Sequence, residues 1–234
     1  MPRPTKRAAF TLIELLVVIT IIGVLAAMAL SALGKTRARG ESARCASNLR
    51  QWGFALQLYM GDYNESIPRR GQGVQPLMLI NRPEDWFNCL PRYLGSQSFS
   101  NLVQQGTPPR AGDASSIFID PSAKNPGGTY FLPYAMNMYL SPWIRPEQHR
   151  LLEIPNPGQL AFMADATGQY SSVVPSQLGY TVVARHSGRA NVVFVDGRVD
   201  SFAGDYLGCG VGEPTRSDIR WQTLSAGINQ APLP

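Results

Sequence analysis

The stretch Ala9-Phe10-Thr11-Leu12-Ile13-Glu14 organises the whole chain, because a short basic leader ends there and a long apolar run begins. Between Phe10 and Leu33 the only ionisable side chain is Glu14. As an α-helix this run is about 36 Å long, which is enough to cross the hydrocarbon core of a bilayer. The sequence therefore predicts a leader over residues 1–9 and a transmembrane helix over residues 10–33.

Glu14 is the unusual residue of this run, because an ionised carboxylate in hydrocarbon costs a few kcal/mol or more unless it meets a cation. The run itself contains no basic side chain. Cleavage of the Ala9–Phe10 bond would free an α-amino group four residues away, and a staggered neighbouring copy would present that amine to Glu14 better than the same chain would. The pattern indicates self-assembly.

Residues Ala9 to Glu14 resemble the processing segment of type IV prepilins and of the pseudopilins of type II secretion. In that family a prepilin peptidase cuts before Phe-Thr-Leu-Ile-Glu, and the new Phe amine is methylated. The resemblance implies cleavage between Ala9 and Phe10, N-methylation of Phe10 and a role for Glu14 in assembly. The family usually has Gly before the cut, where this chain has Ala9.

The same resemblance implies partners and a location. The partners would be the prepilin peptidase/methyltransferase, like subunits, an inner-membrane assembly platform and membrane lipid. The protein would cross the inner membrane once, with its head outside the cytoplasm.

Two other interpretations of the N-terminal run remain open, a plain anchor and a cleaved signal peptide. Ala27-Met28-Ala29 satisfies the small-x-small rule for signal peptidase. The run is longer than the usual 7–15 apolar residues of a signal peptide and contains an acid, which favours the prepilin interpretation. The basic residues Lys35, Arg37, Arg39 and Arg44 follow the run and suit contact with lipid headgroups.

Charge and composition limit the class of the remaining chain. The 234 residues include 21 basic and 16 acidic side chains, a net charge of +5, and three of the basic residues belong to the leader. The processed chain would therefore be too weakly basic to indicate nucleic-acid binding. Nineteen prolines and twenty-two glycines predict a loop-rich head over residues 64–234.

A helix is predicted to continue over residues 34–63, because Cys45, Leu49, Trp52, Leu56 and Tyr59 recur at alternating spacings of four and three. This stripe should pack on a sheet. Residues 66–126 look like a loop-rich insertion, with a helix from Pro83 to about Leu94 and a short strand at Ile117-Phe118-Ile119.

The C-terminal half contains the alternating patterns that predict strands. They lie at residues 129–132, 160–163, 180–184, 191–195 and 198–202. Asp196-Gly197 separates the last two and predicts a type I′ hairpin. The sequence thus predicts an α+β, pilin-like fold in which a long N-terminal helix packs against a C-terminal antiparallel sheet.

A second resemblance lies in this half: His186, nine residues and then Asp196-Gly197 are similar to the His-x9-Asp-Gly signature of planctomycete and verrucomicrobial prepilin-like proteins. Cys45 to Gln51 and Tyr134 to Asn137 fit the same group. Many members have a Cys-Pro pair near the middle, where this chain has Asp120-Pro121.

No catalytic site is predicted. Ser187 and Ser201 lie near His186 and Asp196 in sequence, but no Gly-x-Ser-x-Gly elbow surrounds either serine. We expect His186 to cap the entry to the hairpin by bonding to the backbone or to Asp196.

No cofactor is expected, although Asp196, Asp200 and Asp205 are candidate calcium ligands. Cysteines 45, 89 and 209 leave three disulfide pairings open, and no Cys-x-x-Cys or Cys/His group has zinc spacing.

Two functions follow from these observations. The first is a structural subunit that enters a type IV pilus or a type II secretion pseudopilus. The second is a membrane-anchored binding module or enzyme that uses the prepilin segment only for targeting.

Overall fold

The computed structural model describes residues 12–71, 80–141, 149–175, 181–212 and 218–222. The chain divides into two compact units, Met1–Gly40 and Glu41–Pro234. The longest element, α1, runs over Leu12–Asp62, so its first part belongs to the first unit and its last part to the second.

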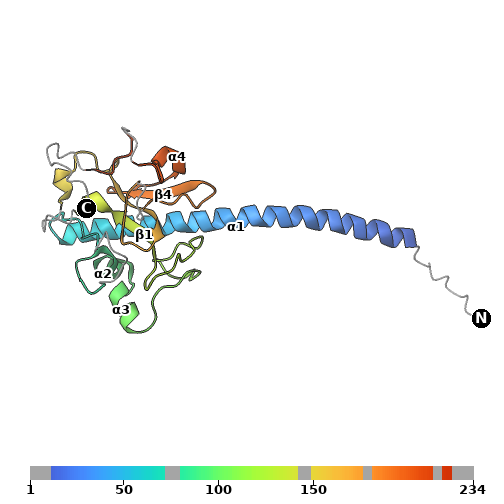
Figure 1. The fold of residues 1–234 in the computed structure, drawn as a ribbon, viewed down its shortest axis with the longest axis horizontal. Helices are drawn as coiled ribbons and strands as arrows, with labels where there is room; N and C mark the ends of the chain where they lie inside the picture. The colour runs from blue at the N-terminus through green and yellow to red at the C-terminus, as the bar shows by residue number, and fades with distance from the viewer. Residues whose placement is uncertain (1–11, 72–79, 142–148, 176–180, 213–217, 223–234) are drawn as a thin grey trace, which may run out of the picture. The chain divides into compact units, whose positions relative to one another are not determined.

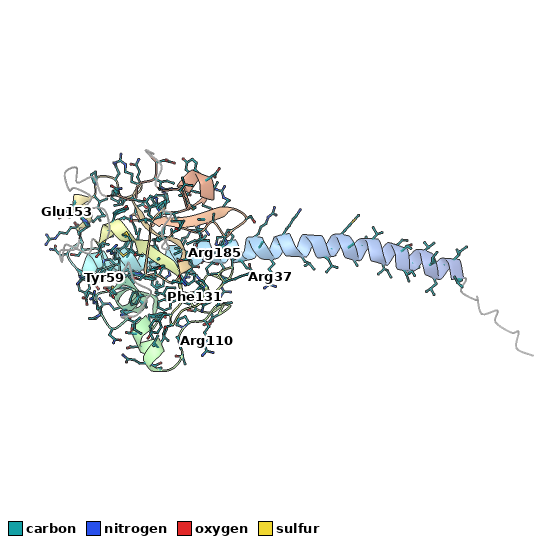
Figure 2. All side chains as sticks on the ribbon, viewed as in Figure 1. Arg37, Tyr59, Arg110, Phe131, Glu153 and Arg185 are labelled. Carbon is teal, nitrogen blue, oxygen red and sulfur yellow. The ribbon has the colours of Figure 1, made fainter. Side chains whose placement is uncertain are left out.

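The first unit is the apolar part of α1. Its large apolar side chains, from Leu12 to Leu33, are exposed (Figure 2). This stretch is long and apolar enough to cross a membrane. Because so much contiguous apolar surface is unfavourable in water, the stretch requires a lipid or protein environment.

The second unit contains the end of α1, several short helices and one sheet (Figure 1). The helices are α2 (Trp86–Cys89), η1 (Pro91–Leu94), α3 (Phe99–Gln104), η2 (Met138–Leu140), η3 (Leu151–Glu153) and α4 (Gly204–Leu207). The strands are β1 (Leu132–Asn137), β2 (Ala161–Gly168), β3 (Ser172–Val173), β4 (Arg189–Phe194) and β5 (Val199–Ala203).

The sheet has the strand order β3-β1-β2-β4-β5. Neighbouring strands are antiparallel except β1 and β3, which pair in parallel. The predicted α+β layout, with a long N-terminal helix and a C-terminal sheet, is confirmed. The sheet is mixed rather than purely antiparallel because β3 joins its edge in parallel.

Two apolar clusters cover the two faces of this sheet, since successive side chains of a strand point to opposite faces. On β4, Val193 belongs to one cluster and Val192 and Phe194 to the other. The first cluster also contains the stripe from Cys45 to Tyr59, which is buried as its spacing predicted. Trp86 and Phe99, from the loop-rich region, lie in this same cluster and are part of the main core.

Several local predictions are wrong. The strand expected at residues 129–132 overlaps β1 only at Leu132, and no named strand covers residues 181–184. Ile117 to Ile119 forms turns instead of a strand, because the carbonyls of Ile117 and Ile119 accept hydrogen bonds from the side chains of Trp52 and Asn48 on α1. The region from Pro83 to Leu94 is divided into α2 and η1, since Pro91 lacks the N–H that a continuous helix needs.

The predicted hairpin exists as β4 and β5, but its turn differs from type I′. Gly197 has a positive φ of 88°, whereas Asp196 does not lie in that region. The Gly197 N–H donates to the Phe194 carbonyl and the Phe194 N–H to the Arg198 carbonyl. Val195 and Asp196 are the two central residues of the turn, and Gly197 follows them in the left-handed conformation. In this arrangement Val195 is buried in the core.

Candidate functional site

The predicted processing residues Ala9 and Phe10 lie outside the described residues. Glu14 lies in the first turn of α1 and is exposed within the first unit. No basic side chain lies between residues 12 and 33.

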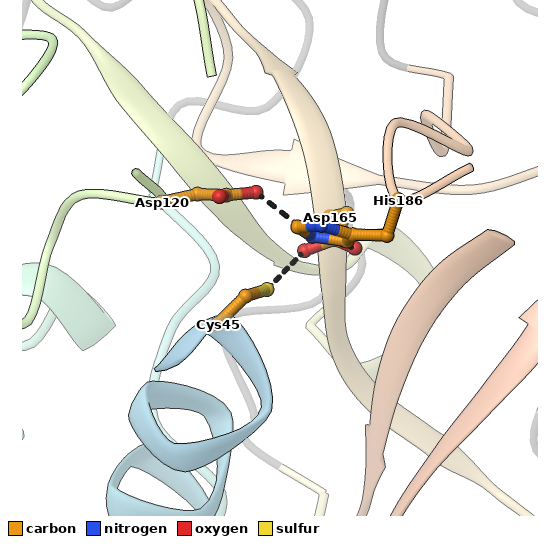
Figure 3. Close-up of side chains that lie close together, drawn as sticks. All are labelled: Cys45, Asp120, Asp165 and His186. Carbon is orange, nitrogen blue, oxygen red and sulfur yellow. Dashed lines mark hydrogen bonds and ion pairs between the residues drawn. The ribbon is translucent and has the colours of Figure 1, made fainter. Parts of the chain in front are cut away.

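The second unit contains a buried group of four side chains that can ionise: Cys45, Asp120, Asp165 and His186 (Figure 3). They come from α1, from the loop between α3 and β1, from β2 and from the loop before β4. The first three residues are fully buried and His186 is 6% exposed. We call these four residues the buried cluster.

The distances within the buried cluster are short. Cys45 Sγ donates to Asp165 Oδ1 at 3.0 Å. His186 Nε2 lies 3.2 Å from Asp120 Oδ2 and 3.4 Å from Asp165 Oδ2. One ligand atom from each of the four side chains lies within 4.8 Å of the others. The sulfur, the imidazole and the two carboxylates therefore point to a common centre.

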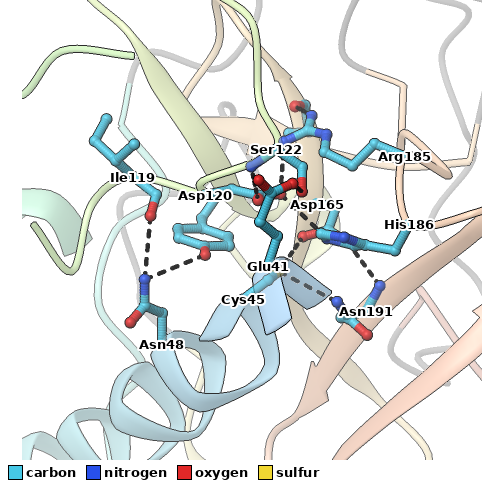
Figure 4. A network of polar contacts seen from close by, with 12 residues as sticks. Glu41, Cys45, Asn48, Ile119, Asp120, Ser122, Asp165, Arg185, His186 and Asn191 are labelled. Carbon is cyan, nitrogen blue, oxygen red and sulfur yellow. Dashed lines mark hydrogen bonds and ion pairs between the residues drawn. The ribbon is translucent and has the colours of Figure 1, made fainter. Parts of the chain in front are cut away.

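Neighbouring groups fix both carboxylates (Figure 4). Asp120 Oδ1 accepts the Ser122 N–H at 2.8 Å, and Asp120 Oδ2 pairs with Arg185 Nη1 at 3.1 Å. Asp165 Oδ2 accepts the Asn191 N–H at 2.8 Å. The Asn191 amide Nδ2 also lies 3.2 Å from Cys45 Sγ. Each acid is thus oriented by a partner outside the buried cluster.

The environment changes the pKa values of these groups. Burial alone would lower the pKa of His186, but the adjacent Asp120 and Asp165 carboxylates raise it to about 9. Burial opposes ionisation of Asp120, and the ion pairs with His186 and Arg185 nevertheless hold its pKa below the usual value. Burial, followed by the two carboxylates, raises the pKa of Cys45 well above that of a free thiol.

The backbone around His186 explains its position. His186 and Arg189 exchange both backbone hydrogen bonds, at 3.0 and 3.1 Å, and close a tight turn at the start of β4. Ser187 and Gly188 in this turn have φ values of 54° and 79°. His186 therefore holds the entry to the hairpin through its backbone. Its side chain contacts Asp120 and Asp165 rather than the expected Asp196.

Asp196 and Gly197 have a separate role at the other end of the hairpin. Asp196 Oδ1 accepts the Arg198 N–H at 2.9 Å. A β-carbon added to Gly53 of α1 would come within 3.0 Å of the Gly197 Cα. Gly197 thus lets the turn contact the helix surface closely.

The three calcium candidates have individual partners. Asp196 bonds to the Arg198 backbone, Asp200 pairs with the Arg198 side chain and Asp205 accepts the Tyr206 N–H. Among the side chains that the structure describes, these three aspartates are not grouped closely enough to share an ion. Calcium binding by them stays a prediction without geometric support.

None of the three cysteines is in a disulfide. Cys45 contacts Asp165 and Asn191, while Cys89 lies 3.6 Å from the Glu84 carbonyl. Cys209 is half-buried beside α4.

Sequence reasoning identified His186 but missed its companions. Cys45, Asp120 and Asp165 are 141, 66 and 21 residues away from it, so no motif could join them. One signal was present, because Asp165 interrupts the apolar strand Ala161-Phe162-Met163-Ala164 and its continuation Ala166. An acid at a buried strand position requires a partner.

Comparison with known proteins identifies only the N-terminal segment. Residues 4–30 match the prokaryotic N-terminal methylation motif. No curated protein and no solved structure matches the chain. The motif and the exposed apolar helix fit a prepilin-like protein that is anchored in a membrane, and they favour a structural subunit over an enzyme.

Proposed function

We propose that this chain is a prepilin-like subunit that is cut after Ala9, methylated on Phe10 and assembled into a type IV pilus or a type II secretion pseudopilus. The observation that carries the proposal is the methylation motif at residues 4–30, which includes most of the exposed apolar part of α1. The prepilin peptidase/methyltransferase and an inner-membrane assembly platform would be its partners. Before assembly the head would lie outside the cytoplasm.

Assembly would satisfy both unusual features of the first unit. Neighbouring helices would cover the apolar side chains between Leu12 and Leu33, which are exposed in a single chain. Glu14 would pair with the Phe10 amine of an adjacent copy. Because an unpaired buried charge is costly, this pair would penalise incorrect axial register.

The first test determines which residue is N-terminal, and whether it is methylated, in the protein purified from its own membranes. A mature chain that starts at Phe10 and carries one extra methyl group supports processing by the prepilin machinery. A chain that starts beyond Ala29 would show cleavage by signal peptidase and would remove the basis of the proposal.

The second test replaces the acid. Glu14→Ala should be processed and inserted but should fail to enter filaments, since the neighbouring amine loses its partner. Glu41→Ala changes an acid in the other unit and should assemble normally. Normal incorporation of Glu14→Ala would overturn the assembly mechanism.

The alternative function, an anchored head that acts alone, has one observation in its favour. A surface cavity of about 480 Å³ is lined by Tyr59, Tyr63 and Arg92 and by polar residues near α2 and α3. The oligomeric state separates the two functions. A monomeric anchored head under conditions that permit assembly supports the alternative, and an ordered polymer supports the subunit.

A further inference from the structure

We propose that Cys45, Asp120, Asp165 and His186 form a structural site for a divalent transition-metal ion of the zinc class. This inference concerns only the second unit and does not depend on filament assembly. It rests on the geometry of the buried cluster, on the chemistry of its donors and on a buried imidazole nitrogen.

The geometry suits four-coordinate binding. Zinc binds sulfur at about 2.3 Å and nitrogen or oxygen at about 2.0–2.2 Å, so the ligand atoms of a tetrahedral site lie roughly 3.3–3.8 Å apart. The buried cluster has contacts of 3.0, 3.2 and 3.4 Å, and its four ligand atoms lie within 4.8 Å of one another. Only small side-chain movements would be needed to place an ion among them.

The donor set selects the kind of ion. Calcium and magnesium prefer sites made of oxygen atoms alone. A thiolate and an imidazole favour zinc and related transition metals, and carboxylates complete such sites. The combination of Cys45, His186 and two aspartates therefore indicates a zinc-class ion.

His186 provides an independent indication of a ligand. Its Nε2 atom is buried and makes no hydrogen bond of acceptable geometry, although Asp120 and Asp165 lie 3.2 and 3.4 Å away. The atom faces into the buried cluster (Figure 3). The two carboxylates face this nitrogen as ion-pair partners, and a metal ion at this centre would replace its proton and bind it directly.

The charges balance around such an ion. A Cys45 thiolate and the two carboxylates supply three negative charges, and a divalent ion with the Arg185 guanidinium supplies three positive charges. Arg185 would stay bound to Asp120 Oδ2, at 3.1 Å. Binding forms a metal–sulfur and a metal–nitrogen bond and releases two protons to solvent, one from Cys45 Sγ and one from His186 Nε2.

The partners outside the buried cluster resemble those that orient metal ligands. The Asn191 N–H bonds to Asp165, its amide contacts Cys45 Sγ, and the Ser122 N–H bonds to Asp120. Such groups fix ligand orientation and raise affinity. With four protein ligands and no exposed position, the site is of the structural class. It would tie α1 at Cys45, the loop at Asp120, β2 and the loop before β4 to one point.

The test uses the full chain in detergent, stripped of metal and titrated with Co²⁺, which reports thiolate ligation through a sulfur-to-cobalt charge-transfer band. We expect one Co²⁺ per chain, displacement of cobalt by Zn²⁺, and a rise in Tm with Zn²⁺ that a chelator reverses. Absence of the band together with an unchanged Tm in excess Zn²⁺ would overturn the proposal. This measurement on the unmodified chain needs no variant.

Matched variants identify the ligands. Cys45→Ser should abolish the charge-transfer band, whereas Cys89→Ser changes another buried thiol and should retain it. His186→Gln should weaken Co²⁺ binding more than about 100-fold, beyond the usual effect of a group outside the ligand shell. His149→Gln, which changes the only other histidine, should bind as tightly as the unmodified chain. A band that persists in Cys45→Ser would assign the metal to a different site.

Discussion

Gly53 of α1 lies directly against Gly197 of the β4–β5 turn. A β-carbon at Gly53 would lie 2.9 Å from Val193 Cγ2 and 3.0 Å from the Gly197 Cα. The second of these contacts is with backbone, which cannot move aside as a flexible side chain can. The distance between the helix and the hairpin is therefore set by two residues without side chains, 144 positions apart in the sequence.

The first prediction concerns this contact. Gly53→Ala should lower the free energy of unfolding of the second unit by about 1–3 kcal/mol, because overpacking outweighs the better helix propensity of alanine. Gly61→Ala is the matched control on the same helix, since a β-carbon there meets no atom within 4 Å. It should stabilise the protein by up to about 1 kcal/mol. Denaturant unfolding of the full chain in detergent measures the free energy of unfolding of both variants. Equal changes in Gly53→Ala and Gly61→Ala would contradict the close contact.

The second prediction concerns Asp85, a buried acid whose two carboxylate oxygens have no hydrogen-bond partner. Burial raises its pKa from 3.8 to about 7, against the smaller opposing effect of Arg82. Between these two values the folded state holds more protons than the unfolded state. The free energy of unfolding therefore falls as the pH rises from about 4 through 7.

Asp85→Asn removes this ionisation. At pH 8 the variant should be more stable than the unmodified protein by on the order of 2–4 kcal/mol, and the advantage should shrink towards pH 4. Asp205→Asn makes the same chemical change at an exposed acid and is the matched control. Thermal unfolding at several pH values checks this expectation. If stability depended on pH in the same way in Asp85→Asn and in the unmodified chain, Asp85 would not be the group responsible.

The third prediction concerns Asn137, a buried side chain at the end of β1. Its amide Nδ2 donates to the carbonyls of Ala161 and Trp221 at 2.8 and 2.7 Å. Asn137→Ala leaves both carbonyls without this donor and should cost about 2–4 kcal/mol of stability. Asn101→Ala changes an exposed side chain of α3 and should alter stability by less than about 0.5 kcal/mol. Denaturant unfolding measures the loss of stability in each variant. Similar losses in the two variants would show that the Asn137 hydrogen bonds contribute little to stability.

The fourth prediction concerns the thiols. Because all three cysteines are free, alkylation in denaturant without a reductant should add three groups per chain, as read by intact mass. In the folded state Cys209 should react first, although burial raises its pKa to about 11, since Cys45 and Cys89 are more deeply buried. One adduct instead of three in denaturant would reveal a disulfide.

Local patterns were sufficient for much of the fold. The buried stripe of α1 follows from alternating spacings of four and three, and the hairpin from two apolar segments around Asp196-Gly197. The turn type was missed because Val195 stays buried, where its N–H donates to the Leu160 carbonyl. The strand expected at Ile117 to Ile119 failed because side chains of α1, rather than a neighbouring strand, bond to its carbonyls.

The sequence by itself determined the anchor and its single acid, because helix length and hydropathy are properties of neighbouring residues. Tertiary structure alone decided the buried cluster and the contact of Gly53 with Gly197. Cys45, Asp120, Asp165 and His186 come from four segments that no local pattern joins. Chemistry of this kind depends on distances in space, which become fixed only when the helix, the sheet and the loops pack together.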